Sequence, residues 1–223
     1  MNGFRVRKRE RKVGPEWVEA FRSLPVANVS DVMGRMTAGA AALRPYYDGA
    51  RMVGPAITVK ARPGDNLMVH KALDIAEPGD IVVVDAGGDL SNAIIGELMV
   101  AHAIQRGLGG IVIYGAIRDS AELSVGGFPV FAAGITHRGP YKDGPGEVNV
   151  PISIAGMVIN PGDLMCGDAD GLLCVSIEDV EAVHAGATYR HEFENKRMAR
   201  IRDGTSDRDW VDSALRKLGC HGV

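Results

Sequence analysis

The chain has 223 residues, of which 46% are hydrophobic and 24% are charged, and its formal net charge at pH 7 is −3. These values exclude a disordered chain and provide enough apolar residues for a hydrophobic core. A small negative charge also argues against a dedicated nucleic-acid-binding protein. No apolar run approaches the roughly 20 residues that cross a bilayer, and no apolar segment follows the basic start, so neither a membrane span nor a secretory signal is expected.

The three cysteines indicate a reducing compartment. Cys166, Cys174 and Cys220 cannot all pair within one chain, and none of them belongs to a Cys-x-x-Cys metal motif. Disulfides are rare in the cytoplasm, where thiols stay reduced. We therefore expect free thiols in a cytoplasmic protein.

The first fourteen residues predict a basic arm. Six bases and only one acid occur before residue 13, which leaves 19 bases and 27 acids for the rest of the chain. Such a terminus is usually solvated, and binding of nucleic acid or of a partner is the less favoured alternative.

The next part of the chain predicts three helices and one long strand. The helices cover residues 15–24, 30–36 and 66–76, and the strand covers residues 52–61. Pro15 stands at an early helical position, where its missing N–H costs nothing, and Asn28 or Ser30 would cap the second helix. Gly54-Pro55 interrupts the strand, which predicts a bulge or a place at the edge of the sheet.

The centre of the chain predicts a βαβ unit. Residues 81–85 form an apolar strand, residues 92–106 a helix that ends at Gly107, and residues 111–114 the following strand. Two strands joined by a helix within about 34 residues predict a parallel pair with a right-handed crossover.

The second half of the chain predicts short strands and then a long helix. The strands cover residues 129–132, 147–150, 157–159 and 172–175. Residues 178–202 form a helix that is acidic at its start and basic at its end, as the helix dipole favours. One more helix is expected around residues 210–218.

Ligands of open α/β sheets bind beyond the carboxyl ends of the strands, and two such ends carry polar residues. After the first strand of the βαβ unit, Gly87-Gly88 leads into the predicted helix, whose amides would favour a carboxylate or phosphate; a tight connection without a ligand is an equal alternative. After the second strand, Arg118 could bind a carboxylate and Asp119 a hard cation, with a surface ion pair or helix cap as the alternative. In an extended segment these two side chains would point to opposite sides.

Glu97 strengthens the second of these sites. In the predicted helix it lies in a row with Ala93 and Val100, and a carboxylate in an apolar row is costly without a partner. The helix begins beside the strand end that carries Arg118 and Asp119. One guanidinium, two carboxylates and helix N–H donors would then meet in one cleft, which suits a divalent metal with oxygen ligands and an acidic substrate.

The spacing of these residues resembles a family signature. Glu97, twenty intervening residues and then Arg118-Asp119 resemble the acidic-x20-Arg-Asp motif of the class II pyruvate aldolases, which act on 4-hydroxy-4-methyl-2-oxoglutarate and 4-carboxy-4-hydroxy-2-oxoadipate. Their RraA-like superfamily also contains the regulator of ribonuclease activity A. Flanking blocks are similar as well: Gly87–Asp89, Gly107–Val112, Gly115–Asp119, Asn149–Ile152, Gly156–Asp163 and Gly167–Gly171.

The resemblance implies a single α/β domain of the layered β/β/α type, similar to swivelling domains, with a central βαβ unit and a long C-terminal helix. The aldolase domain would span residues 15–204, between the basic arm over residues 1–14 and a C-terminal tail over residues 205–223. Members of the family assemble as homotrimers or homohexamers, with active sites between subunits.

The resemblance also assigns roles to residues. Asp119 would be the ligand of a divalent metal, Mg²⁺ or Mn²⁺, and Arg118 would bind the carboxylate and carbonyl of the substrate. Glu97 corresponds to the acidic position that holds metal-bound water. Glu194 on the C-terminal helix, with Glu192 as a close rival, would reach a neighbouring subunit's site. The pyruvyl carboxylate would be bound by the backbone amides of four successive residues, Asn92, Ala93, Ile94 and Ile95.

The implied function is metal-dependent cleavage of a 4-hydroxy-2-oxo acid to pyruvate and a second oxo compound. Oxaloacetate decarboxylation would be a side activity, because it passes through the same enolate. The alternative is a non-catalytic regulator that binds a ribonuclease or a helicase. A methyltransferase is disfavoured, because no glycine-rich nucleotide loop follows the first strand.

Overall fold

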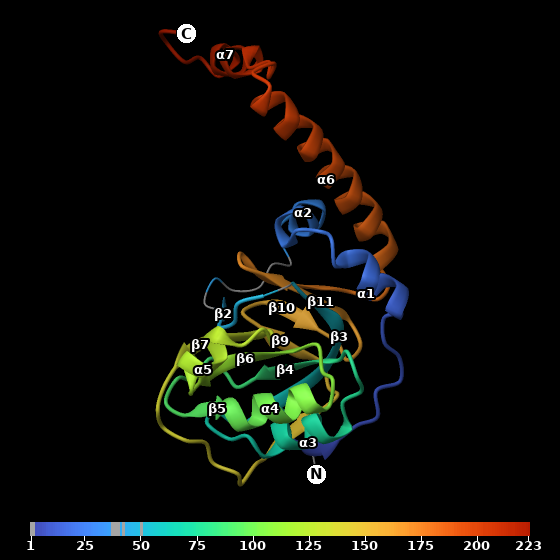
Figure 1. The fold of residues 1–223 in the computed structure, drawn as a ribbon, viewed down its shortest axis with the longest axis vertical. Coiled ribbons are helices and arrows are strands. Elements are labelled where there is room, and N and C mark those ends of the chain that lie inside the picture. Colours follow the sequence, from blue (N-terminus) through green and yellow to red (C-terminus); the bar gives the residue numbers. More distant parts are fainter. Residues whose placement is uncertain (1–2, 37–40, 42, 50) are drawn as a thin grey trace.

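A computed structural model describes residues 3–36, 41, 43–49 and 51–223 of the chain (Figure 1). The helices are α1 Pro15–Phe21, α2 Val26–Val32, α3 Leu67–Ile75, α4 Glu97–Gln105, α5 Ser120–Val125, α6 Val180–Arg202 and α7 Asp209–Lys217. The strands are β1 Phe4–Val6, β2 Arg44–Pro45, β3 Met52–Ala61, β4 Ile81–Asp85, β5 Ala93–Ile95, β6 Gly110–Ile117, β7 Val130–Ile135, β8 Gly146–Val148, β9 Ile152–Ile154, β10 Met157–Ile159, β11 Leu164–Asp168 and β12 Gly171–Val175.

The main sheet is mixed, with a parallel centre. Its strands follow the order β1-β8-β3-β4-β6-β7-β2, and the neighbours from β3 to β7 are parallel. The predicted βαβ unit is confirmed, because β4 and β6 lie side by side and α4 connects them. Both strands are fully or almost fully buried and rich in Val and Ile, as expected for parallel strands that are covered on both faces.

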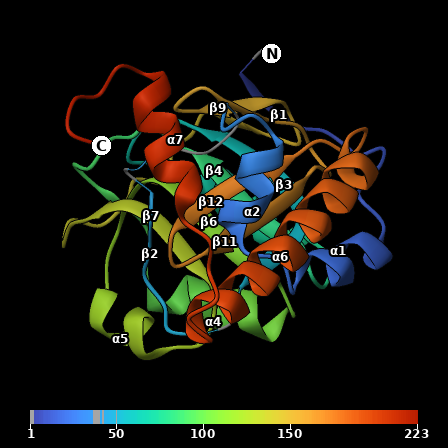
Figure 2. The ribbon, with the colours of Figure 1, turned by 90° about the horizontal axis from the view of Figure 1, so that it is seen from above.

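Three apolar clusters divide the fold into layers. The first fills the space between the sheet and helices α3 and α4. The second lies between the other face of the sheet and the β9–β10 hairpin, and the third joins β11 and β12 to α1, α2 and α6. Figure 2 looks onto this last helical layer, with the sheets beneath it. The layered α/β fold with a long C-terminal helix is therefore confirmed.

Strand β3 lies inside the main sheet, and the irregularity predicted at Gly54-Pro55 coincides with a change of strand partner. Its first four residues pair with β11, and from Ala56 onward it pairs with β4. The change of partner takes place directly after Gly54-Pro55. A Cβ on Gly54 would lie 2.4 Å from the carbonyl oxygen of Gly79, so the two chain segments can approach this closely only at glycine.

Helix α2 begins at Val26, four residues before the expected start. Pro25 stands at its N-cap with extended backbone angles, and neither Asn28 nor Ser30 caps it. Val26 and Val29 are buried against the layer below, so apolar packing decides the helix start over the better capping residues. Asn28 is also buried, and its side chain reaches α6.

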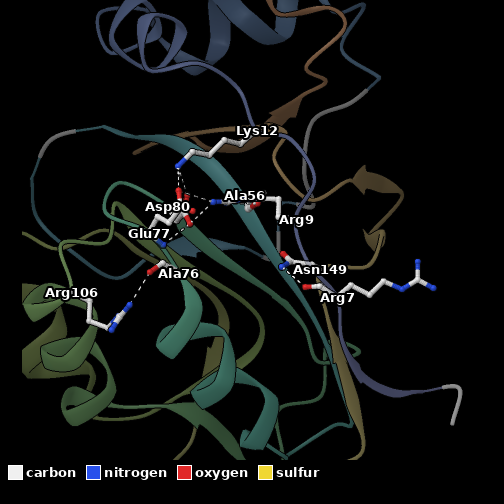
Figure 3. A network of polar contacts seen from close by, with 9 residues as sticks. All are labelled: Arg7, Arg9, Lys12, Ala56, Ala76, Glu77, Asp80, Arg106 and Asn149. Atoms are coloured by element: carbon white, nitrogen blue, oxygen red, sulfur yellow. Dashed lines mark hydrogen bonds and ion pairs between the residues drawn. The ribbon is translucent and has the colours of Figure 1, made fainter.

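The basic N-terminal segment is held against the domain by specific contacts, although most of its residues remain exposed (Figure 3). Strand β1 extends the sheet by pairing with β8, and the Asn149 amide donates to the carbonyl oxygen of Arg7 at 3.0 Å. Arg9 donates to the fully buried Asp80 at 2.8 Å, and Lys12 lies 2.5 Å from Glu77. Arg5, Arg9, Arg11 and Lys12 therefore form ion pairs with acids of the domain, a pairing that a count of charges cannot reveal.

Helix α6 leaves the body of the domain after its first turns (Figure 1). Val180, Val183 and Ala187 are buried, whereas Phe193 and Ile201 are 56% and 53% exposed. Helix α7 lies at the end of this extension and buries none of its residues. Among the described residues, no helix is long and apolar enough to span a membrane.

Candidate functional site

The expected helix over residues 92–106 is in fact a short strand followed by a helix. Residues 93–95 form β5, which pairs in parallel with the end of β6, and α4 begins at Glu97. Ile94 and Ile95 are buried beside the sheet, a position that suits β-branched side chains. Ala93 is therefore not on the helix, and Glu97 is exposed, so the argument from a carboxylate in an apolar row is wrong.

Arg118 and Asp119 lie next to each other beyond the carboxyl end of β6. Asp119 has a left-handed backbone with φ of 57°, and the two side chains meet at 3.6 Å between Nε and Oδ2. The expected extended segment with opposed side chains is therefore wrong. The N–H of Glu97 donates to the same Asp119 oxygen at 2.9 Å, which confirms that α4 begins beside this pair.

Gly96 allows this close approach. A Cβ at this position would lie 2.3 Å from Asp119 Oδ2 and 2.9 Å from Arg118 Cγ. Any side chain would displace both functional groups, so glycine is required between β5 and α4.

A cavity of about 250 Å³ opens beside Arg118. Its polar lining consists of Arg118, Asn66, His70 and Lys142, and its apolar lining includes Ile95 and Met99. Sequence reasoning missed Asn66, His70 and Lys142. Asn66 and His70 are one helical turn apart at the start of α3, and this i, i+4 pair of polar residues was the available signal.

The polar groups that line the cavity differ in their hydrogen bonding and charge. The Asn66 amide donates to the carbonyl oxygen of Ile94 at 2.9 Å, whereas its buried Oδ1 accepts no hydrogen bond in the described part of the chain. Burial lowers the pKa of His70, and the positive charge of Lys142 lowers it further. Near neutral pH the cavity therefore presents two fixed cations, a neutral imidazole and an unused acceptor.

The expected anion site formed by the Gly87-Gly88 turn is absent from the described structure. Asp85 accepts the N–H of Gly87 at 3.0 Å, and the turn leads into β5 and not into a helix. The N–H of Ala93 donates to the carbonyl oxygen of Arg138 at 2.8 Å, so this predicted carboxylate donor already has a protein acceptor. Asn92 uses its side chain on Gly139, and Ile94 and Ile95 line the cavity.

The two predicted glutamates do not reach this cavity within one chain. Glu97 lines a separate hollow of about 200 Å³ between α4 and α5, together with Glu122. Glu194 lies on α6, on the far side of the domain from α4, and Glu192 is an exposed residue of the same helix (Figure 1).

Comparison with known proteins identifies the family. The family model described as RraA-like, Aldolase/RraA, matches residues 26–174. This chain belongs to the RraA-like family.

Individual relatives cover most of the chain. A protein of Halalkalibacterium halodurans, named "Putative 4-hydroxy-4-methyl-2-oxoglutarate aldolase", is 38% identical over 84% of this chain and 90% of its own length. The 4-hydroxy-4-methyl-2-oxoglutarate aldolase of Thermus thermophilus is 36% identical over 56% of this chain and 75% of its own. A structure named as the RNA-processing inhibitor RraA, also from Thermus thermophilus, superposes with a TM-score of 0.63 at 31% identity, covering 68% of this chain and 92% of that one.

The family match includes some of the candidate residues and leaves out others. Glu97, Arg118 and Asp119 lie inside the matched residues 26–174, as do the cavity residues of α3. Glu194 lies beyond them, on the C-terminal extension of this RraA-like chain.

The residues present fit a hard divalent cation that keeps much of its water. In the described part of the chain, no group of three or more His, Cys, Asp or Glu residues could hold a metal. Asp119 supplies a carboxylate next to Arg118, which lines the cavity. Mg²⁺ is commonly bound by one or two carboxylates, water and oxygens of the substrate, so Asp119 is a suitable protein ligand.

Proposed function

We propose that this RraA-like protein is a divalent-metal-dependent lyase that cleaves a 4-hydroxy-2-oxo acid to pyruvate and a second oxo compound. The observation that carries this proposal is the Arg118-Asp119 pair at the N-terminus of α4, in which Arg118 lines a cavity that holds a second cation. The names of the aldolase relatives support the same class of reaction.

The cavity favours a substrate with two carboxylates. Arg118 can bind the 2-oxo carboxylate end of the molecule through its planar fork of donors. Lys142, on the opposite chain segment, can bind a carboxylate at the other end. The Asn66 oxygen is placed to accept the O–H of a hydroxyl group between them.

The residues of this chain then assist breakage of the bond between C3 and C4. The 4-hydroxyl loses its proton, its oxygen becomes the carbonyl of the second product, and the bonding electrons pass to the pyruvate enolate. Arg118 donates hydrogen bonds to the enolate oxygen as its charge develops. Glu97, whose backbone N–H donates to Asp119 and whose side chain lines the neighbouring hollow, is proposed to hold the water that takes the hydroxyl proton.

Asp119 is the proposed ligand of the metal, for which Mg²⁺ and Mn²⁺ are the candidates. When bound, such an ion acts as a Lewis acid that stabilises the negative charge of the enolate. With the metal bound, Glu97 would still hold the water and Arg118 would still donate hydrogen bonds to the enolate oxygen. The same enolate arises when oxaloacetate loses carbon dioxide, so we propose oxaloacetate decarboxylation as a side activity.

The complete site is proposed to lie between subunits of a homotrimer or homohexamer. Glu194 is remote from Arg118 in its own chain, and α6 carries exposed apolar residues beyond the body of the domain. A neighbour's helix could bring Glu194 to the open side of the cavity, where the residue would transfer a proton. We place the reaction in the cytoplasm, since all three cysteines are free thiols.

The second candidate is regulation of a ribonuclease or a helicase by protein contact. The likeness to a protein named as an RNA-processing inhibitor favours it. Glu97, Arg118 and Asp119 would have no common task in such a regulator, so we rank the lyase first.

A pyruvate-release assay and a ribonuclease-binding measurement together separate the two candidates. The protein is stripped with EDTA, and pyruvate release is followed over a panel of 4-hydroxy-2-oxo acids and oxaloacetate, with and without added Mg²⁺ or Mn²⁺. We expect release that is abolished by EDTA and restored by either ion. Full activity without metal would exclude the proposed mechanism, and tight ribonuclease binding without any turnover would favour the regulator.

A further inference from the structure

Helix α2 lies along α6 in a regular register. Three contacts join them at four-residue intervals of α6: Gly186 with Val32, Arg190 with Asp31, and Glu194 with Asn28. A Cβ on Gly186 would lie 3.3 Å from the Val32 side chain, so the helices approach closely at this glycine. Because the helices touch at this glycine, α2 has a fixed position along α6. Each polar residue of α2 therefore meets a fixed partner on α6.

This register holds the Glu194 carboxylate at both of its oxygens. Asn28 Nδ2 donates to Oε2 at 2.6 Å, and Arg190 Nε lies 3.4 Å from Oε1. Asp31 forms an ion pair with the same Arg190 guanidinium and so fixes its position. Asn28 is only 4% exposed, whereas the Glu194 side chain is 48% exposed.

A structural role for these contacts explains little of this arrangement. Ion pairs between exposed side chains contribute little to stability, and a glutamate on a solvated helix needs no partner. A buried polar group is costly unless it is hydrogen-bonded. The buried Asn28 amide nevertheless has a half-exposed carboxylate as its partner. The result is an oriented carboxylate that is still half-exposed, on the part of α6 that follows its last buried residue.

We infer that Asn28 and Arg190 are positioning residues that hold the Glu194 carboxylate in the orientation it needs in a neighbouring subunit's site. The inference rests on the proposed function, in which Glu194 transfers a proton during cleavage. Proton transfer depends on the placement of the acceptor within a fraction of an ångström, and charge-assisted hydrogen bonds supply such placement.

The test compares Asn28→Ala and Arg190→Met with Arg190→Lys and with the control Arg197→Met. Arg197 is two turns further along α6 and contacts the Trp210 ring in place of a carboxylate. We expect Asn28→Ala and Arg190→Met each to lower kcat for pyruvate release about tenfold and to change KM less than twofold, since the first removes a hydrogen bond to the Glu194 carboxylate and the second removes its ion pair. Arg190→Lys should recover part of the loss, and Arg197→Met should match the wild type.

A double-mutant cycle with Glu194→Gln separates positioning from loss of structure. Asn28→Ala should slow the Glu194→Gln enzyme less than twofold, because nothing remains to be positioned. An unchanged tenfold loss in that background, or an equal change in KM, would overturn the inference. If Glu194→Gln itself turns over like the wild type, the role of Glu194 and this inference both fail, while the lyase proposal stands.

A second readout needs no turnover, and therefore stands apart from the lyase proposal. The side-chain carboxyl carbon of Glu194, assigned by its loss in Glu194→Gln, is observed by NMR of protein labelled at glutamate. Asn28→Ala should move this resonance, and Arg197→Met should leave it in place. A resonance that is the same in all variants shows that Asn28 does not hold the carboxylate.

Discussion

The charged residues at the two ends of the parallel strands, called here the amino edge and the carboxyl edge of the sheet, differ in burial. At the amino edge, Asp80 is fully buried before β4 and is bound by Arg9, whose side chain is 10% exposed (Figure 3). At the carboxyl edge, the side chains of Arg118 and Asp119 after β6 are 42% and 36% exposed, and Arg118 lines a cavity. In the first pair each charge is compensated by the other inside the protein. In the second pair both charged groups remain accessible to a ligand.

The difference predicts which variants affect stability and which affect activity. Removing one partner of a buried ion pair leaves an uncompensated charge in the interior and destabilises the protein. Removing a half-exposed group leaves a solvated partner and changes the folding free energy little. Substitutions at the amino edge should therefore alter unfolding, and those at the carboxyl edge should alter turnover.

The largest expected effect is that of Asp119→Asn on turnover. An amide lacks the negative charge that binds a divalent cation, so we expect pyruvate release to fall about 10³-fold, with partial recovery at high metal concentration. Steady-state assays across a metal titration measure this, and Asp89→Asn is the control, because Asp89 accepts hydrogen bonds from Ser91 within its own turn. Wild-type turnover in Asp119→Asn would remove this residue from the site.

Arg118→Ala should have the next largest effect. It removes the donor to the developing enolate, so we expect kcat/KM to fall about 10²-fold while the melting temperature stays near that of the wild type. Arg118→Lys keeps the charge but loses the planar fork, and it should recover only part of the loss. A large drop in melting temperature without a change in kcat/KM would show that Arg118 belongs with the structural charges of the amino edge.

Arg9→Met tests the amino edge. Asp80 would lose its nearest cation but keep Lys12 at 3.7 Å and the N–H of Glu77 at 2.8 Å, so we expect a loss of about 2 kcal/mol in unfolding free energy, less than for a fully orphaned charge. Denaturant unfolding measures the loss, with Arg7→Met as the control, because the exposed Arg7 side chain points away from the domain (Figure 3). Activity per folded molecule should not change. Equal stability of the two variants would contradict the contrast between the edges.

Sequence reasoning predicted the elements that apolar patterning determines. Strand β4 and hairpin strand β10 occur at the expected residues, and α6 begins two residues late. The errors fall where tertiary contacts override local signals. Ile94 and Ile95 join the sheet at the start of the expected helix, and Pro25 begins α2 ahead of the better caps.

The candidate site shows the same limit. The Arg118-Asp119 pair could be located from its place after an apolar strand. Lys142 could not, because its loop is brought to the cavity by contacts between residues far apart in the sequence, among them the parallel bridge between Asp65 and Tyr141. The ion pair of Arg9 with Asp80 joins residues 71 positions apart, and no periodicity in the sequence connects them.

The smallest expected effect concerns the loss of stability in acid, which begins at a different pH at each edge. The pKa of Glu77 is lowered by Lys12, so its contribution to stability is present above its ordinary value near 4.5 and is lost as the pH falls below it. At the carboxyl edge the pKa of His70 is lowered from 6.5, first by burial and then by Lys142. The unfolded chain therefore binds a proton at His70 more readily, and stability declines as the pH falls below 6.5.

His70 can be followed directly by NMR titration of its ring. We expect a midpoint below 6.5, a rise of the pKa in Lys142→Met, and a further fall in Asp74→Asn, since Lys142 lowers and Asp74 raises the pKa of His70. Opposite shifts from two single-charge changes would show that His70 and Lys142 share the cavity beside Arg118 and respond to each other's charge. A midpoint that does not move in Lys142→Met would separate Lys142 from the cavity, and with it the second carboxylate position of the proposed substrate.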